Sequence, residues 1–456
     1  MAATLEARPE AHGADTRGGD RPEIAGRPGS ASSSPPGSTG PARSSERGLG
    51  RPYWQLWGAA SVSSLGDGLA VVALPLLAAG LTRSPALVAG VVVAQRLPWL
   101  LLSLPAGALA DRLHRGRLMA SVDVARAAIL VGVALAVSAD VLTITALYLA
   151  AFGLGALECA FSAAAHAAVP ALVADNALDR ANGYLFASQA SGEQLAGPAS
   201  GGLLFAAGAA IPFALDGASF LVSALLLLGV ARRLPRPART AQTSLAGDIG
   251  EGVRFFARDR LLRALAVLVG GLAFCQAAVM GVLVLFALEV LDLGHVGYGV
   301  FLGAAAVGNV AGAVAAPRLK ARLGATAVLV GAALAAGAVY LLMAGTRSAV
   351  AATALMAVEA FAVAAGSVVS ITLRQAAVPD ELRGRVGNVF RMCIWGVIPL
   401  GALAGGLAAG VFGLRAPFLM AGGAQLLLVT VTAGRLRAAV ARPVIDLRPV
   451  AAPAVS

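Results

Sequence analysis

Charge in general and lysine in particular are scarce in this chain of 456 residues. Only 13% of the residues are charged, against about 25% in a soluble domain, and 58% are apolar. Lys320 is the only lysine, and it lies in Arg-Leu-Lys-Ala-Arg, whereas a nucleotide-binding P-loop ends in Gly-Lys-Ser or Gly-Lys-Thr. These scarcities exclude a Walker-type ATPase and disfavour a water-soluble enzyme.

Cysteine, histidine and aromatic residues are also few. The three cysteines, Cys159, Cys275 and Cys393, lie inside apolar segments, so the sequence predicts no disulfide framework. The four histidines are scattered, which predicts no metal cluster, and no nucleophile lies beside a base. We therefore expect neither a cofactor nor enzymatic chemistry. With aromatic residues at 5% of the chain, no stacking site for a ligand is evident.

Long apolar segments are abundant instead. A helix crosses a bilayer with roughly 20 apolar residues, and the chain has room for twelve such spans between Tyr53 and Leu436. The sequence therefore predicts an all-α membrane protein with twelve transmembrane helices in two six-helix bundles. The predicted spans are 54–80, 87–109, 118–138, 141–165, 183–208, 211–231, 264–290, 297–316, 324–345, 348–373, 386–411 and 415–435.

A polar connection separates the two sets of six spans. It contains an amphipathic stretch, Asp248 to Arg260, whose apolar spacing at Ile249, Val253 and Phe256 is typical of a helix at a membrane surface. The predicted parts are a disordered cytoplasmic tail at 1–52, six-helix bundles at 53–231 and 264–436, a cytoplasmic linker at 232–263 and a cytoplasmic tail at 437–456.

The distribution of arginine predicts how the spans are oriented. With the N-terminus inside, only Arg83, Arg347 and Arg415 fall in outer connections, while 30 of the 35 basic residues fall in inner ones. Because basic connections stay in the cytoplasm, both termini are predicted to be cytoplasmic. The excess of arginine thus reflects membrane orientation, and no nucleic-acid partner is expected. The strong alanine and arginine bias favours a GC-rich bacterial genome, and hence the bacterial cell (inner) membrane.

A glycine- and arginine-containing motif follows the second predicted span. Its glycines allow close helix approach, its aspartate can face a helix N-terminus, and its arginines can bind headgroups or carboxylates. The motif residues are Gly107, Asp111, Arg112, Gly116 and Arg117. They resemble the inner-loop signature of the major facilitator superfamily, although the second-half counterpart lacks the aspartate.

The sequence position of other charged residues near the span ends predicts where they lie. Asp123 and Arg126 are three residues apart near the inner end of the third span, so they share a helix face and are expected to join the inner gate. Asp216, Glu289 and Asp292 are expected at the outer rim, where solvation is cheap.

The fifth span contains Gly-Pro-Ala-Ser-Gly-Gly at 197–202. Its proline kinks the helix and its glycines admit a neighbouring helix. Gly197, Pro198, Gly201 and Gly202 resemble the antiporter signature of proton-coupled drug exporters in the same superfamily, although a kinked helix without that meaning is the alternative. The segment is echoed about 200 residues later by Pro399 and Gly405-Gly406, which is typical of two matched six-helix halves.

The connection before the eleventh span and the start of that span form a second-half inner loop that contains Arg374, Pro379, Arg383, Arg385 and Arg391. This loop resembles a particular branch of that superfamily, the exporters related to macrolide-efflux and enterobactin-export proteins. Ser64 to Asp67 and the amphipathic stretch fit the same branch, and the resemblance covers 53–436.

Five ionisable residues, Asp67, Arg96, Glu158, Glu193 and Glu359, are predicted to lie within spans. Each costs at least a few kcal/mol there, so each is a candidate for proton or substrate binding or for pairing. Asp67 and Arg96 lie at comparable depth in neighbouring spans and can form a pair. Asp67 and Glu193 are the preferred proton carriers; the alternative for each is a permanent hydrogen bond to a neighbouring helix.

The resemblance implies a monomeric secondary-active transporter that exports a drug, an antibiotic or a siderophore by alternating access, driven by protons. The alternatives are an importer or facilitator of a nutrient and a transport-inactive membrane partner. The expected partners are the substrate, protons and the bilayer. Buried acids outnumber buried bases, which favours cationic or neutral lipophilic cargo.

Overall fold

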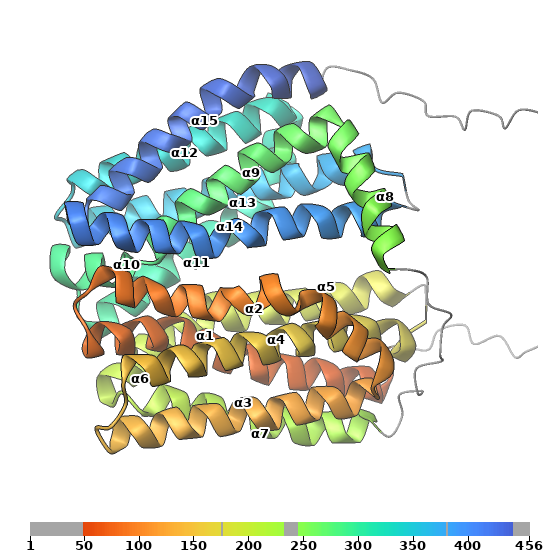
Figure 1. Ribbon diagram of the computed structural model, residues 1–456, viewed down its shortest axis with the longest axis vertical. Coiled ribbons are helices and arrows are strands. Elements are labelled where there is room, and N and C mark those ends of the chain that lie inside the picture. The colour runs from red at the N-terminus through yellow and green to blue at the C-terminus, as the bar shows by residue number, and fades with distance from the viewer. Residues whose placement is uncertain (1–48, 175–176, 232–244, 380–381, 441–456) are drawn as a thin grey trace, which may run out of the picture. The chain divides into compact units, whose positions relative to one another are not determined.

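The computed structural model describes residues 49–174, 177–231, 245–379 and 382–440, and the elements in these ranges are helices (Figure 1). Residues 1–48 and 441–456 of the predicted tails, and residues 232–244 of the predicted linker, lie outside the described residues. Several helices begin where the sequence supplies a capping side chain. Thr143, Ser348 and Asp259 each accept a hydrogen bond from the backbone N–H three residues on.

The first set of helices is coloured red to yellow-green in Figure 1 and the second green to blue. The first set comprises α1 (Arg51–Leu81), α2 (Pro85–Arg112), α3 (Arg115–Ser138), α4 (Ile144–Leu172), α5 (Leu178–Gln189), the π-helix η2 (Ala190–Ala196), α6 (Gly197–Ala207) and α7 (Ile211–Ala231). The second comprises α8 (Leu245–Arg258), α9 (Arg260–Met280), α10 (Leu283–Leu285), the π-helix η3 (Phe286–Val290), α11 (His295–Leu323), α12 (Ala325–Gly345), α13 (Ala349–Ala377), α14 (Arg383–Phe412) and α15 (Ala416–Val440).

The predicted all-α membrane fold is confirmed. Eleven of the described helices are long and apolar enough to cross a membrane. The predicted fifth span is present but divided among α5, η2 and α6, which together fill residues 178–207. Pro198 explains the division, because a proline cannot donate the helical hydrogen bond and its ring crowds the carbonyl four residues earlier. The wider π-helical turn before Pro198 relieves that crowding.

The amphipathic stretch of the predicted linker forms α8, which packs on α14. The rings of Phe256 and Phe390 meet edge to face, with their centroids 6.4 Å apart. Arg385 of α14 forms an ion pair with Glu251 of α8. Phe255 and Phe256 of α8 therefore pack against the second set of helices.

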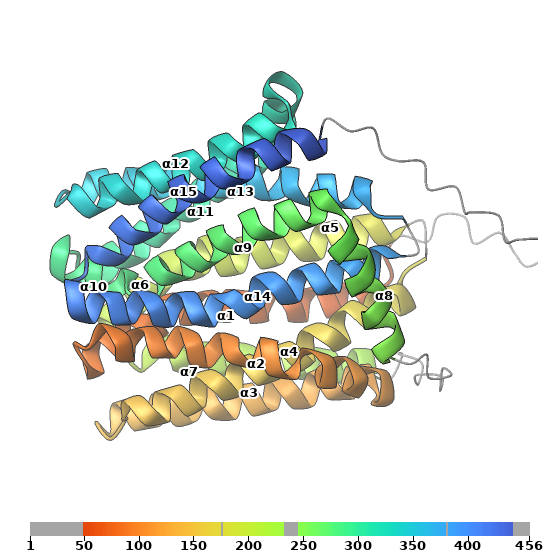
Figure 2. The ribbon, with the colours of Figure 1, turned by 45° about the horizontal axis from the view of Figure 1, so that its top comes forward.

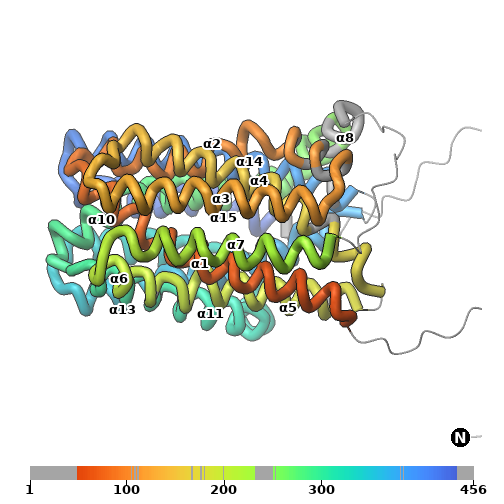
Figure 3. The backbone as a smooth tube through the Cα atoms, turned by 90° about the horizontal axis from the view of Figure 1, so that it is seen from below, coloured from red at the N-terminus to blue at the C-terminus, as the bar shows by residue number. Residues whose placement is uncertain are grey.

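Most helix contacts lie within each set, and two long pairings join the sets: α2 with α14, and α6 with α11 (Figures 2 and 3). We call the end of the helices that contains Arg51, α8 and Arg437 the basic end. The other end, with the connections at 82–84, 208–210 and 346–348, is the opposite end. Each joining pair runs from the opposite end toward the middle of the helices.

The glycine echo seen in the sequence has a structural counterpart at these pairings. A Cβ atom at Gly202 would lie 2.6 Å from the carbonyl oxygen of His295 and 3.0 Å from Cα of Gly299, in α11. A Cβ atom at Gly406 would lie 2.7 Å from Cβ of Ala89, in α2. The distances of 2.6 and 2.7 Å are shorter than real Cβ contacts, so each glycine is required for its half to approach the other half closely.

Gly405 supplies a test of this packing inside the second set, because a Cβ atom there would collide with the carbonyl oxygen of Ala278 in α9. We expect Gly405→Ala to lower the free energy of unfolding by about 1–3 kcal/mol through overpacking. The matched control is Gly132→Ala, since no atom lies within 4 Å of a Cβ atom at Gly132. Thermal unfolding of the purified protein measures both; equal midpoints for the two variants would contradict the packing described.

Candidate functional site

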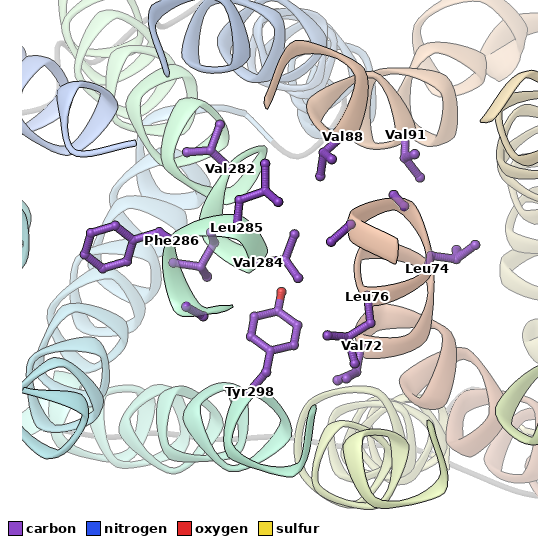
Figure 4. Close-up of a cluster of buried hydrophobic side chains, with 14 of the residues drawn as sticks. Val72, Leu74, Leu76, Val88, Val91, Val282, Val284, Leu285, Phe286 and Tyr298 are labelled. Atoms are coloured by element: carbon purple, nitrogen blue, oxygen red, sulfur yellow. The ribbon is translucent and has the colours of Figure 1, made fainter. Parts of the chain in front are cut away.

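The opposite end is sealed by a buried apolar cluster to which both sets contribute (Figure 4). Val72 of α1 and Val88 of α2 come from the first set, while Val284 of α10 and Tyr298 of α11 come from the second. An exposed ion pair closes the same end, with Arg83 Nη1 lying 3.4 Å from Glu289 Oε1. Glu289 is thus at the rim, as its sequence position predicts.

Toward the basic end the two sets have separate apolar cores. One core cluster is built from α1, α3, α4, α5 and α7, and another from α9, α12, α13, α14 and α15. A cavity of about 230 Å³ lies between α2 and α4 of the first set and α14 of the second. A cavity of about 370 Å³ extends along α13 and α14, and Arg391 and Trp395 line both. The molecule is therefore closed at the opposite end and hollow on the basic side of that closure.

Arg126 of α3 is the buried cation of the first set, with 2% of its surface exposed. Its guanidinium carbon lies 5.5 Å from the ring centre of Phe161 and 5.0 Å from that of Phe220. It interacts electrostatically with four carboxyl groups, which come from α1, α3, η2 and α7. These are Asp67, Asp123, Glu193 and Asp216. We call Arg126 and these four acids the Arg126 cluster.

No carboxylate of the described residues comes within ion-pair distance of Arg126, and its Nε is buried without a hydrogen-bond partner. Two of the acids are held instead by neighbouring hydroxyls. Ser223 Oγ donates to Asp123 Oδ2 at 2.6 Å, and Ser219 Oγ donates to Asp216 Oδ1 at 3.3 Å. A buried cation that is attracted to several acids but bound to none can change partners at small cost, because no strong pair has to be broken.

The predicted rim location of Asp216 is wrong, since its side chain is only 1% exposed. Its place five residues into α7 suggested access to solvent. Gly66 explains the burial: a Cβ atom there would collide with Asp216 Oδ1, so the bare glycine lets α1 close over the carboxyl group.

The predicted pair of Asp67 with Arg96 is also absent from the described residues. Asp67 interacts with Arg126 and Glu158, whereas the Arg96 guanidinium lies 5.8 Å from the ring centre of Trp395 in the second set. Glu193 interacts with both Asp67 and Glu158. The structure therefore brings three of the four predicted carboxyl groups together.

Glu359, the fourth of these predicted carboxyl groups, lies elsewhere. Its Oε1 accepts a 2.7 Å hydrogen bond from the Tyr340 hydroxyl, it also interacts with Gln276, and 1% of it is exposed. These partners belong to α12 and α9 of the second set. The geometry matches the alternative that the sequence left open, a carboxyl hydrogen-bonded to neighbouring helices.

The residues predicted for the inner gate separate into two places. Arg112 and Arg117 are exposed at the basic end, where Gly116 packs against Ala231 of α7. The surroundings of Gly107 and of the Asp111 side chain lie outside the described part. Asp123 and Arg126 are buried in the Arg126 cluster and do not accompany the exposed arginines, because α3 turns them toward α7 and α1.

The antiporter-like residues Gly197, Pro198, Gly201 and Gly202 line the surface of α6 that meets other helices. Gly197 packs on Cα of Gly68 and Gly201 on Leu69, both in α1, while Gly202 faces α11. A Cβ atom at Gly68 would lie 3.0 Å from Cα of Glu193. The contact of these small residues is thus what places Asp67 beside Glu193.

The second-half loop residues surround the larger cavity or anchor α8. The Arg374 guanidinium lies 3.9 Å from the ring centre of Phe390, and Arg383 Nε donates to the Gln375 carbonyl at 3.2 Å. Arg385 holds Glu251 of α8, Pro379 is exposed after α13, and Arg391 lines both cavities.

Sequence reasoning missed the contact between Trp99 of α2 and Trp395 of α14, whose rings lie 4.4 Å apart. Composition gave no sign of it, because aromatic residues are rare. A signal was present in the spacing, however. Arg96 and Trp99 are three apart and Arg391 and Trp395 are four apart, so each helix presents an arginine and a tryptophan on one face.

Two matched helix sets, sealed at one end and enclosing buried charges, define a membrane transporter of the major facilitator fold, and solved structures agree. A bacterial homologue of the iron transporter ferroportin, in an inward-facing state, matches with TM-score 0.69 and 17% identity, covering 87% of this chain and 100% of that one. A bacterial homologue of the human lysosomal transporter Spinster, inward-facing and occupied, gives 0.66 and 15%, covering 85% and 96%. The nucleoside transporter NupG gives 0.68 and 14%, covering 85% and 100%.

The family model described as transmembrane secretion effector matches residues 51–453, and the chain belongs to this family of major facilitator transporters. No curated protein matches it in sequence. The family and the structural neighbours are transporters. Their agreement rests on the fold, since each of these structures is under 20% identical to the chain.

Arg126 itself can be tested. We expect Arg126→Gln to lower the free energy of unfolding by about 3 kcal/mol, because the buried acids lose their common cation. Arg117→Gln, at an exposed position of the same helix, should change it by less than about 0.5 kcal/mol. Adding Asp216→Asn to Arg126→Gln should restore part of the loss. Thermal unfolding measures all three, and an Arg126→Gln variant as stable as the Arg117→Gln control would remove the cluster's proposed dependence on this cation.

Proposed function

We propose that this protein is a monomeric exporter of the bacterial cell membrane that moves a small molecule outward in exchange for protons. The observation that supports this proposal is the Arg126 cluster, in which four helical segments contribute carboxyl groups to one buried cation. Carboxyl groups inside a membrane protein are costly unless they bind an ion or a partner. A proton arriving at one acid removes a negative charge and shifts Arg126 toward the others.

The glycine contacts offer a route from such a shift to the movement of the two halves. Glu193 lies in η2, and η2 continues into α6, whose Gly202 meets α11 of the second set. A π-helical turn can change its register at low cost, so η2 is suited to move when Glu193 gains or loses a proton. Because α6 contacts both α1 and α11, its movement changes the closure of the opposite end.

We propose that the basic end faces the cytoplasm, as the arginine distribution predicts. The cavities on the basic side of the seal would then receive cargo from the cytoplasm. The segment from Gly107 to Arg117 is proposed to gate this end, as its resemblance to the superfamily signature implies. With this orientation, the structure corresponds to the state in which an exporter binds its cargo from the cytoplasm.

If Asp67 and Glu193 couple protons to transport, their substitution should impair transport driven by a pH gradient but not the exchange of cargo for cargo. A toxicity panel of drugs, antibiotics and siderophores on a deletion strain first identifies the cargo. In proteoliposomes, Asp67→Asn and Glu193→Gln should then reduce accumulation driven by a pH gradient at least about tenfold, while cargo-for-cargo exchange persists. Exchange needs no net proton movement, so it reports an intact carrier.

Asp140→Asn, at an exposed turn, is the matched control and should retain both activities. Full gradient-driven accumulation in both test variants would eliminate these acids as proton carriers. Gradient-driven uptake into the cell, in place of export, would replace the exporter with an importer. Absence of any transport, together with stable co-purification of one protein, would favour a transport-inactive partner.

Orientation is tested separately by labelling. In a variant without Cys159, Cys275 and Cys393, new cysteines at Arg115 and Arg383 should react with a membrane-impermeant maleimide only after the inner face is exposed. A cysteine at Arg347 should react on intact cells, because it lies at the opposite end. The reverse pattern would invert the proposed direction.

A further inference from the structure

The two cavities on the basic side of the seal form one vestibule around Arg391 and Trp395, which line both. Their volumes of about 230 and 370 Å³ are together in the range that holds a drug-sized molecule. The lining includes Trp99 from α2 of the first set and Arg374 from α13 of the second. Both halves of the transporter therefore contribute to it.

The charge of this vestibule is positive. Arg374 and Arg391 interact electrostatically with each other, and the described lining residues include no acidic side chain. Stacking of Arg374 on Phe390, at 3.9 Å, fixes the plane of its guanidinium, and its Nε is buried without a hydrogen-bond partner. Two neighbouring cations in a partly dry cavity are unfavourable alone and favourable around an anion.

The aromatic wall lies next to these cations. The Trp99 and Trp395 rings meet at 4.4 Å with an interplanar angle of 47°, and Arg96 lies 5.8 Å from the Trp395 ring centre. The Trp99 Nε1–H is buried without an acceptor, so it is a donor that a bound molecule can satisfy. Indole faces stack well on other aromatic rings. The wall is thus suited to a flat ring that carries an acceptor.

We propose that the vestibule is the cargo site and that it selects compact aromatic acids, with the acid group on Arg374 and Arg391 and the ring against Trp99 and Trp395. This inference rests on the proposed function, because it assumes that the vestibule receives cargo. It reverses the preference for cationic or neutral cargo that the sequence predicts. The buried acids that favoured cations lie in the Arg126 cluster, at Glu158 beside it and at Glu359, and none of them is among the vestibule's lining residues.

An anionic lipid headgroup shares part of this chemistry. The tryptophan pair distinguishes a lipid headgroup from a free aromatic acid, because a headgroup phosphate needs the arginines but gains nothing from an aromatic wall. A free aromatic acid needs the arginines and the tryptophans. We therefore assign the vestibule to free acids, and the experiment below includes a lipid arm.

The test is equilibrium binding of radiolabelled 2-naphthoate to the purified full-length protein in phosphatidylcholine nanodiscs, without any gradient. At neutral pH the wild type should bind 2-naphthoate at least about tenfold more tightly than 2-naphthylmethylammonium, which has the same ring and the opposite charge. It should also bind 2-naphthoate more tightly than octanoate, which has the charge but no ring. Arg391→Gln should weaken 2-naphthoate binding about tenfold, and Trp395→Leu should remove the preference over octanoate.

The matched control is Arg437→Gln, because Arg437 is an exposed arginine of α15 at the basic end. This variant should bind 2-naphthoate like the wild type. Equal affinity for the two naphthalene probes, no measurable naphthoate binding, or equal losses in Arg391→Gln and Arg437→Gln would overturn the proposal. The proposal would also be overturned if naphthoate binding is lost when the nanodiscs are made of phosphatidylglycerol and octanoate binds as tightly as naphthoate does. Because binding needs no proton gradient, failure of proton-driven export alone leaves this assignment standing, and selective export of cations would overturn this assignment alone.

Discussion

The attraction between one buried guanidinium and carboxyl groups from four helical segments organises the first half of this transporter. Arg126 is almost fully buried between two aromatic rings, and the described residues bring no acid into direct ion-pair contact with it. Such an arrangement satisfies the need to neutralise a charge in the membrane without committing that charge to one partner. The position of Arg126 can therefore depend on which acids are ionised.

Small residues determine which acids share this cation. Without a side chain at Gly66, α1 closes over Asp216, and without one at Gly68, α1 packs on the π-helical turn that contains Glu193. On its other side the same broken span meets α11 of the second half at Gly202. The helix with the least regular geometry is thus the one that contacts the charged cluster, α1 and the opposite half. Its irregularity follows from Pro198, so the same short segment contains both the kink and the glycines that contact the neighbouring helices.

Apolar periodicity and arginine distribution in the sequence were enough to predict the helices and the broad fold, because bilayer thickness limits the choices. Clustering in three dimensions was harder to predict. Asp216 was placed at the rim from its position near a helix start, since nothing local reveals that Gly66 lets another helix cover it. Arg96 was paired with Asp67 on depth alone, whereas it lies beside Trp395, about 300 residues away in sequence. Contacts between halves depend on helix rotation, which depth and hydropathy do not define.

The two chemical environments also explain why the cargo proposed from the structure differs from the one that composition predicts. Acids gather in the first half around Arg126, and arginines with tryptophans gather in the vestibule between the halves. Averaging over all buried charges mixes a site proposed for protons with one proposed for cargo. In the proposed mechanism, protonation acts on the helices of the Arg126 cluster, while an anionic cargo meets the positively charged vestibule.

We propose that protons at the Arg126 cluster control which end of the transporter is open. Distances between spin labels measure this directly, with one pair at Arg117 and Arg322 of the basic end and another at Asp140 and Arg347 of the opposite end, all exposed. On acidification we expect a longer distance at the opposite end and a shorter one at the basic end. The double variant Asp67→Asn with Glu193→Gln should show, at every pH, the distances that the unsubstituted protein shows at acidic pH. If the distances in the unsubstituted protein do not change with pH, protonation of the cluster does not set which end is open.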